Sequence, residues 1–570
     1  MSPTQDGKKR RTIGLLVDNL FDAHEEAIRR TIMQEAEAAD ANLICFLGGR
    51  AWGQYHGRAL YELAGPENVD GIISVSTCLQ LAEESKEGEQ APGSSLDGAL
   101  EALLRGYAPV PVVSLGKPVR GIPTLLVENS AGLRDLMEHM VVVHGLQRIA
   151  FIRGPAGNEE AEARFQAYRS VLEKHGLPYD ESRVFQGDFQ PESGTRAAKV
   201  LLDERHAEFD GLVAANDYMA IYASEEFQRR GIAIPGKIAI GGFDDIRPAV
   251  AHKPPLTTVR QPTREMARLS VEYILAMIQG QSVPPSRNLP TSLVIRGSCG
   301  CVADSGDVKD LGVLAGTSEG GAIAGQMLGR RLQLMYPWVG EILRDPSWAE
   351  DLVGCFYSEM EKGTGTRFLA ALEKQVARGL ELGIMGSEWQ MLVKSMYEGL
   401  RRQIPSHVRE RIGALRDRSM LLVANFTERF QIALNVKQGA EIQNLQRVFR
   451  RVNKAAGEDL WLRLEEHLPM MGIRSFFLLR EDHASAGRIS LEHHFSHDDD
   501  VALDPSLASC PTGRLLPGTF TQAHRYTFIV LPVHAGPECT RFAVCSLGAV
   551  SGAVFESIAY QLGHALDADR

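Results

Sequence analysis

Two pairs of polar residues, each following an apolar run, have the side chains best suited to binding chemistry. Asn216 and Asp217 form the first pair, and Asp244 and Asp245 form the second. Carboxylate and amide oxygens accept hydrogen bonds from the hydroxyl and amino groups of small polar molecules, and the guanidinium of Arg164 supplies matching donors. These residue types predict a site that binds a small polar ligand.

A strand–helix–strand unit is expected to position both pairs. The apolar runs Gly211–Ala215 and Ile238–Ile240 read as strands, and residues 219–230 between them read as a helix that ends at Gly231. Strands joined in this way are parallel, so their carboxyl ends meet at one edge of the sheet, where ligands bind. Both polar pairs are therefore expected at the mouth of one crevice.

Three motifs extend this pattern. The chain reads VAANDYMA at 213–220, IAIGGFDD at 238–245 and PPLTTVRQP at 254–262. In this order and spacing they resemble the effector-binding domain of the lactose-repressor (LacI/GalR) family, which shares its fold with periplasmic sugar-binding proteins. The resemblance implies an α/β fold over residues 12–301, with two lobes of doubly wound parallel sheet. It also implies three hinge crossings between the lobes, near residues 122–128, 245–250 and 290.

The resemblance also implies roles for individual residues. The family's matching Asp, Asn and Arg contact the effector, so Asp244, Asn216 and Arg164 are expected to bind ligand here. Asp244 could instead serve only the structure of the strand end. Asp217 either joins the ligand site or caps the helix that follows it.

The first lobe offers further candidates in loops after its strands. Asp18, Asn19 and Phe21 follow the first strand, on the side that faces the crevice. Trp52 and Tyr55 either stack on a sugar ring or pack beneath the lobe.

Beyond Cys301 the chain no longer resembles a repressor. Residues 1–11 read as a disordered tail, 302–318 as a linker, 319–453 as an all-α region and 454–570 as a small α/β domain. The last domain resembles a GAF-type sensory or dimerisation domain in its layout. Residues 442–452 form either a coiled-coil linker or a helix that packs on its own domain. One helix, Thr366–Leu382, carries an apolar stripe at three- and four-residue intervals: Phe368, Leu369, Leu372, Val376 and Leu380.

Charge and length bear on nucleic-acid binding. The formal net charge is −11, and an acidic chain does not bind DNA through bulk charge. Family repressors carry a helix-turn-helix before the first strand, whereas only 11 residues precede Thr12 here. Direct DNA binding is therefore not expected, although Arg401, Arg402 and the segment 409–418 offer modest basic support for it.

The eight scattered cysteines fit reduced thiols in a cytoplasm. Cys299 and Cys301 form one close pair, but a zinc site needs further ligands and none lies nearby in the sequence. In the run from His493 to Asp500, His493 and His494 are expected in an extended segment, where they point to opposite faces, and the rest reads as a solvent loop. No metal and no cofactor are predicted, and the sequence has no phosphate loop, nucleophile elbow or His-Glu-x-x-His pair that would indicate an enzyme.

The sequence thus predicts a cytoplasmic sensor, without signal peptide or membrane span, for a sugar or nucleoside. Closure of the lobes is expected to be relayed, within a homodimer, to a separate signalling protein. The alternative is a transcription regulator that reaches DNA through the helical region or through a partner.

Overall fold

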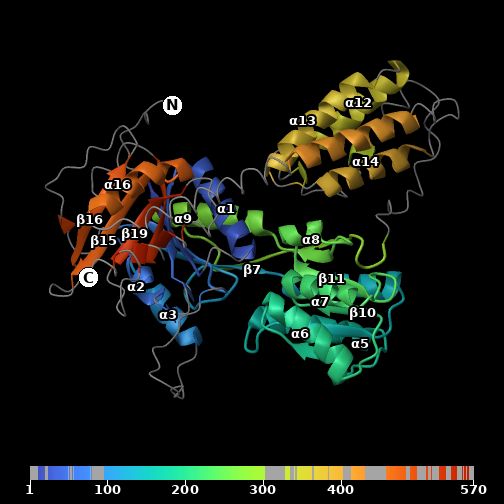
Figure 1. The fold of residues 1–570 in the computed structure, drawn as a ribbon, viewed down its shortest axis with the longest axis horizontal. Coiled ribbons are helices and arrows are strands. Elements are labelled where there is room, and N and C mark those ends of the chain that lie inside the picture. The colour runs from blue at the N-terminus through green and yellow to red at the C-terminus, as the bar shows by residue number, and fades with distance from the viewer. Residues whose placement is uncertain are drawn as a thin grey trace.

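The computed structural model describes most of residues 10–301, 328–430 and 458–566. It does not describe residues 302–327 and 431–457, nor three of the predicted site residues, Asn19, Phe21 and Trp52. Figure 1 shows two α/β lobes, with helices of the α region beside the second lobe and the C-terminal strands beside the first. The predicted α/β class with parallel sheets and a helical region is confirmed.

The first lobe is built on parallel strands in the order β13-β7-β6-β5-β1-β2. Two of its strands, Thr12–Val17 and Asn42–Leu47, are buried at every position, as expected for a sheet covered on both faces. The strands are β1 Thr12–Val17, β2 Asn42–Leu47, β5 Gly71–Ser74, β6 Val112–Leu115, β7 Thr124–Val127 and β13 Ser286–Leu289, with a small hairpin of β3 Arg50–Ala51 and β4 Gln54–Tyr55. The helices are α1 Ala23–Ala38, α2 Gly57–Glu62, α3 Leu96–Gly106 and α9 Thr263–Ile278.

The second lobe has a six-stranded sheet in the order β14-β12-β11-β10-β8-β9, parallel except for β14. The predicted strand–helix–strand unit is confirmed as β10, α7 and β11. The strands are β8 Ile149–Arg153, β9 Val184–Gln186, β10 Gly211–Ala214, β11 Ala239–Asp244, β12 Thr257–Arg260 and β14 Ser292–Val294. The helices are α4 Asn129–Glu138, α5 Glu159–Lys174, α6 Pro191–Lys199, α7 Asp217–Arg229 and α8 Arg247–Ala251, with π turns at His139–Val143 and Val200–Glu204 and a 3₁₀ turn at Glu181–Arg183.

The chain crosses between the lobes three times, but the second crossing is not where it was predicted. It passes from β7 to α4 at Glu128, and from β13 to β14 at residues 290–291, as expected. The crossing predicted near 245–250 lies instead at Gln261–Pro262. The reason is that β12 pairs in parallel with β11, which keeps the chain in the second lobe through Arg260.

The strands described after residue 454 do not form a sheet of their own, and the predicted small α/β domain over 454–570 stays a prediction. Strand β18 pairs in parallel with β2 of the first lobe, so one sheet of 11 strands runs through both regions. Phe528 and Val530 of β18 share a core with Ile44 and Phe46 of β2. The elements are α16 Glu458–His467, a 3₁₀ turn Pro469–Met471, β15 Ser475–Asp482, β16 Arg488–Ser496, β17 Ser509–Cys510, β18 Thr527–Val533 and β19 Arg541–Ser546.

The helical region has a core of its own. Helices α12 (Trp348–Lys362), α13 (Thr366–Leu382) and α14 (Gly386–Arg401) pack together with residues 412–430, and Trp348 meets Trp389 edge to face. The stripe predicted on Thr366–Leu382 is confirmed, since four of its members are buried and Leu369 packs against the same core. The predicted helix 442–452 lies outside the described residues. Within the described part of the chain, no helix has the length and apolarity needed to span a bilayer.

Candidate functional site

Arg164, on α5, lies at the carboxyl edge of the second lobe's sheet and is 2% exposed. Its Nε donates to Oδ1 of Asn129 at 2.9 Å, and its Nη1 donates to the carbonyl oxygen of Ala215 at 2.7 Å. The guanidinium also lies 3.8 Å from the ring centre of Phe243. Because hydrogen bonds and a cation–π contact hold it on three sides, the guanidinium is fixed before any ligand arrives.

Asp244 ends β11 next to this guanidinium. Its Oδ1 lies 3.7 Å from Nη1 of Arg164 and accepts a hydrogen bond from Nε2 of Gln261 at 2.7 Å. The backbone φ of Asp244 is 113°, in the region that favours glycine, and such strain concentrates at functional sites. The structure therefore places a fixed donor and a fixed acceptor side by side.

The two residues that support this pair both lie at hinge crossings. Asn129 follows the first crossing, and Gln261 lies within the second. Sequence reasoning identified neither as a site residue, although each lies shortly after a strand, where the chain passes from one lobe to the other. A ligand that displaced Arg164 or Asp244 would therefore disturb hydrogen bonds made by hinge residues.

Asn216 and Asp217 each have a structural role in the second lobe. Asn216 is the N-cap of α7: its Oδ1 accepts from the amide of Met219 at 3.0 Å, so the alternative that Asp217 caps this helix is wrong. Asp217 is fully buried and accepts from the amide of Ile246 at 3.0 Å and from Oγ1 of Thr258 at 2.5 Å. Burial, with the charge of Asp244, raises the pKa of Asp217 well above its usual value.

In the first lobe, Asp18 is buried at the end of β1, and its amide donates to Oε2 of Glu25 at 3.2 Å. Asn19, Phe21 and Trp52 lie outside the described residues. Sequence reasoning also missed a chain of buried hydroxyl groups at the ends of β5 and β6, where Ser114 donates to Ser76 and Ser76 donates to Ser74. A ligand role for any predicted site residue stays a prediction.

The two-lobed fold agrees with the proteins to which this chain is similar. The family model for the periplasmic binding protein-like domain matches residues 139–299. The HTH-type transcriptional regulator CelR of Thermobifida fusca is 32% identical over 230 residues, which cover 38% of this chain and 67% of the relative. The ribose operon repressor of Halalkalibacterium halodurans is 33% identical over 235 residues, which cover 40% of this chain and 69% of the relative.

The chain belongs to the LacI/GalR family. A further relative in the family, the HTH-type transcriptional repressor CytR of Escherichia coli K12, is 27% identical over 289 residues, or 50% of this chain and 79% of the relative. The solved structure of a CelR–cellobiose complex has 27% identity and a TM-score of 0.43, covering 51% of this chain and 85% of that one. These relatives are named as transcriptional regulators and not as enzymes, in agreement with the prediction of a non-enzyme.

A buried cluster of charges joins this LacI/GalR-type second lobe to the helical region, and sequence reasoning did not foresee it. Asp245 lies 2.6 Å from Nε of Arg260 and 2.7 Å from Nη2 of Arg296. Glu388 of α14 lies 3.0 Å from Arg260 and 3.7 Å from Arg296. Burial raises the pKa of the Asp245 carboxyl, but the two guanidinium groups outweigh burial and hold it below its usual value.

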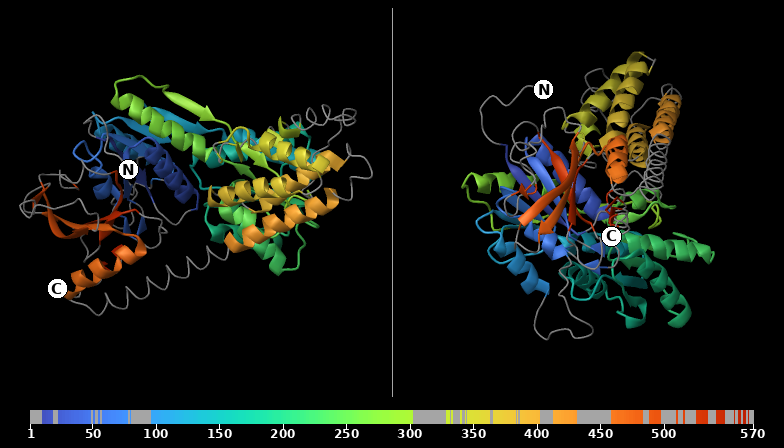
Figure 2. Two further views of the ribbon diagram at one scale, coloured as in Figure 1. Left: turned by 90° about the horizontal axis from the view of Figure 1, so that it is seen from above. Right: turned by 60° about the vertical axis from the view of Figure 1, so that its left-hand side comes forward.

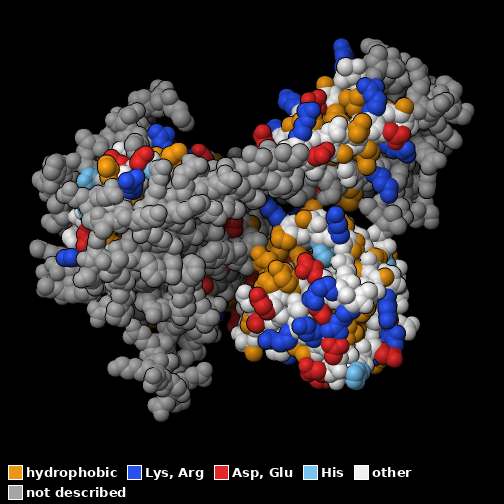
Figure 3. All heavy atoms as spheres, viewed as in Figure 1, with side chains coloured by type: hydrophobic (Ala, Val, Ile, Leu, Met, Phe, Trp, Pro, Cys, Tyr) orange, Lys and Arg blue, Asp and Glu red, His pale blue; other side chains and the backbone are white. Residues whose placement is uncertain are grey.

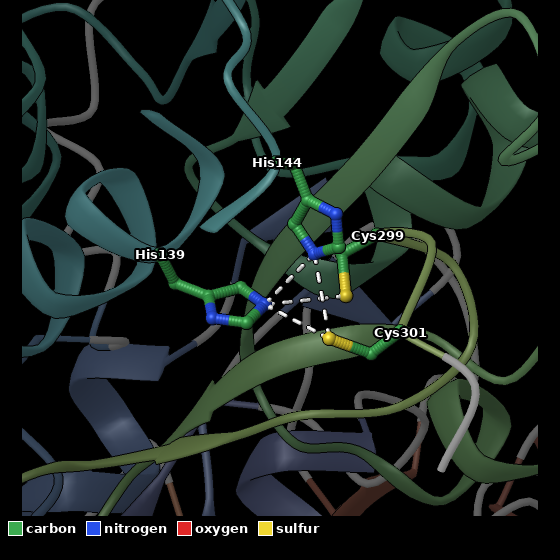
Figure 4. Close-up of side chains that lie close together, drawn as sticks. All are labelled: His139, His144, Cys299 and Cys301. Carbon is green, nitrogen blue, oxygen red and sulfur yellow. Dashed lines mark hydrogen bonds between the residues drawn. The ribbon is translucent and has the colours of Figure 1, made fainter. Parts of the chain in front are cut away.

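No further candidate ligand lies near the cysteine pair in the sequence, but the fold brings two histidines to it. His139 and His144 lie beside Cys299 and Cys301, and this is the one group of three or more metal-binding side chains in the described part of the chain (Figure 4). Burial, with the neighbouring His144, lowers the pKa of His139 to about 4, so its ring is neutral at pH 7. The predicted extended segment is confirmed, since His493 and His494 lie on β16, where both are exposed; His497–Asp500 of the predicted solvent loop lie outside the described residues.

Proposed function

We propose that this chain is a regulatory sensor that binds a sugar or nucleoside between its lobes and passes lobe closure to the helical region. The observation that carries the proposal is the position of Asp244 and Asp245. The first lies beside Arg164 in the candidate ligand site, and the next residue in the chain lies in the charge cluster that holds Glu388 of α14. Movement of one carboxylate therefore acts on the other through a single peptide unit.

The arrangement of the other parts supports this relay. The helical region contacts the second lobe through Glu388, whereas the strands after residue 454 extend the first lobe's sheet (Figures 1 and 2). Closure of one lobe toward the other would change how the helices sit relative to the C-terminal strands. A ligand biases that change only by its difference in affinity between the open and closed states.

The ligand class rests on the residues and on the relatives. A fixed guanidinium beside a fixed carboxylate suits the paired hydroxyl groups of a sugar or a ribose. The ribose operon repressor and CelR are named as regulators, and the former is named for a sugar operon. Assembly as a homodimer stays a prediction, and size-exclusion chromatography with light scattering tests it.

The proposal is tested by a thermal-shift screen of the full chain against sugars, nucleosides and their phosphates. A ligand at about one hundred times its Kd stabilises the form that binds it by roughly 2.7 kcal/mol. The shift should disappear in Asp244→Ala and persist in the control Asp135→Ala, which replaces an exposed carboxylate on α4 of the same lobe. An equal shift in both variants would rule out Asp244 as a ligand residue.

A second candidate function is transcription regulation through DNA, and the family favours it, because the relatives are named as HTH-type regulators or repressors. The prediction against direct DNA binding therefore lacks support from the relatives. Charges of both signs are mixed over the face of the second lobe and helices in Figure 3. Fluorescence anisotropy with a labelled duplex tests this function: binding at low salt that weakens steeply as salt rises would support it. No binding at low salt would exclude it for the chain alone.

A further inference from the structure

Four side chains that bind metals converge where the ligand-binding region ends. His139 begins the π turn after α4, His144 directly follows that turn, and Cys299 and Cys301 come from the segment after β14. Their ligand atoms all lie within 4.8 Å of one another, and Figure 4 shows the four side chains pointing toward a common centre. Two imidazoles and two thiols are a ligand set that zinc favours in structural sites.

Four of the six distances between the ligand atoms are close to those around a single tetrahedral ion. Zinc lies about 2.0–2.1 Å from nitrogen and about 2.3 Å from sulfur, so a tetrahedron has edges of about 3.3 Å between two nitrogens and about 3.6 Å between nitrogen and sulfur. The Nε2 atoms of His139 and His144 are 3.2 Å apart. Nε2 of His139 lies 3.4 Å from Sγ of Cys299 and 3.5 Å from Sγ of Cys301, and Nε2 of His144 lies 3.4 Å from Sγ of Cys301.

The backbone is shaped to bring the ligands together. In an α-helix, residues five apart point roughly 140° away from each other, so His139 and His144 would not share a face. The π turn His139–Val143 changes this register, and π turns often occur at functional sites. Gly300, with a φ of 103°, turns the chain between the two cysteines, and a Cβ there would lie 3.4 Å from Nδ1 of His144.

Surrounding contacts hold the cysteine segment in place. Oγ1 of Thr257 donates to Sγ of Cys299 at 3.1 Å. Next to it, Oγ of Ser298 donates to the carbonyl oxygen of Ile240 at 2.6 Å and accepts from the amide of Thr257 at 2.8 Å. Such contacts orient metal ligands and raise the affinity of a site.

We propose that His139, His144, Cys299 and Cys301 bind one zinc ion as a structural site. All four positions of the tetrahedron are filled by protein atoms, which distinguishes a structural site from a catalytic one with an open position. The ion would tie the segment 299–301 to the π turn after α4. It would therefore fix the point at which the chain leaves the second lobe on its way to the helical region.

The test is metal content measured by mass spectrometry on the full chain, after incubation with zinc sulfate and exhaustive dialysis. The wild type should retain one equivalent of zinc, and so should Cys355→Ser, a control that removes a cysteine of the helical region. Cys299→Ser/Cys301→Ser should retain none. Equal zinc in the double variant and the wild type would overturn the proposal, and so would no bound zinc in the wild type.

A spectroscopic readout keeps the test independent of whether the double variant folds. Cobalt(II) in place of zinc reports tetrahedral geometry and thiolate ligands through its visible ligand-field and sulfur-to-metal bands. Wild type titrated with cobalt should show both, with an end point at one equivalent, and zinc should remove them. Octahedral cobalt spectra without thiolate bands would contradict the site.

Discussion

The carboxylate of Glu388 lies 3.0 Å from the guanidinium of Arg260, and this ion pair ties helix α14 to strand β12 of the second lobe. The side chain of Glu388 is 7% exposed and that of Arg260 is 21% exposed, so the pair is largely shielded from water. Arg260 also pairs with Asp245, the neighbour of Asp244. The candidate ligand site and the helical region are therefore connected by one peptide bond, between Asp244 and Asp245, and two ion pairs, Asp245–Arg260 and Arg260–Glu388.

Removing the charge of Glu388 should loosen the helical region. Glu388→Gln removes a carboxylate that lies beside both Arg260 and Arg296, and a buried charge that loses a partner costs about 2 kcal/mol. The expected result is a lower urea midpoint for the variant. Glu381→Gln on α13 is the matched control, since Glu381 is exposed, and its midpoint should equal that of the wild type. Equal midpoints for both variants would mean that the ion pair adds nothing to stability.

The buried Asp217 should make the wild type less stable as pH rises. Its folded pKa is raised, so its contribution to stability is complete below the unfolded value of 3.8 and is lost as pH rises toward the folded value. Asp217→Asn keeps an acceptor for the amide of Ile246 and carries no charge. The stability of Asp217→Asn relative to the wild type should therefore increase from pH 5 to pH 8 in urea titrations. A constant difference across this range would contradict the raised pKa.

The attachment of the C-terminal strands to the first lobe should depend on Asn42. This residue is fully buried, donates to Oγ1 of Thr12 at 3.3 Å and accepts from the amide of Tyr526 at 3.1 Å. Asn42→Ala leaves that amide without its partner, at a cost of about 1–3 kcal/mol. Limited proteolysis should then release the segment after residue 454 sooner than in the wild type. Unchanged protection would mean that this segment is not held by its pairing with β2.

The site arginine should not tolerate lysine. Arg164 makes two hydrogen bonds with different nitrogen atoms and lies over the ring of Phe243, and lysine has one nitrogen and no planar group. Arg164→Lys should lose ligand-induced thermal stabilisation and lower the melting temperature without ligand. Arg169→Lys, on the same helix, is the control and should retain both properties. Retained ligand response in Arg164→Lys would remove this residue from the site.

Local patterns predicted most of the second lobe, because a strand–helix–strand unit is formed by contiguous residues such as 211–244. Contacts between distant segments were not predictable in this way. Strands β2 and β18 pair across more than 480 residues, and Arg260 meets Glu388 across 128. The group of two histidines and two cysteines could not be predicted from the sequence for two reasons. His139 and Cys299 are 160 residues apart, and a π turn determines how the two histidines are oriented relative to each other.

Hydrogen–deuterium exchange of the full chain, with and without a ligand found in the thermal-shift screen, tests the relay most directly. Ligand should change the exchange of α14 as well as that of the segment 239–261 in the wild type. In Glu388→Gln the change at 239–261 should persist and the change in α14 should be lost. If α14 responds equally in both proteins, or in neither, then ligand binding does not reach the helical region through Glu388.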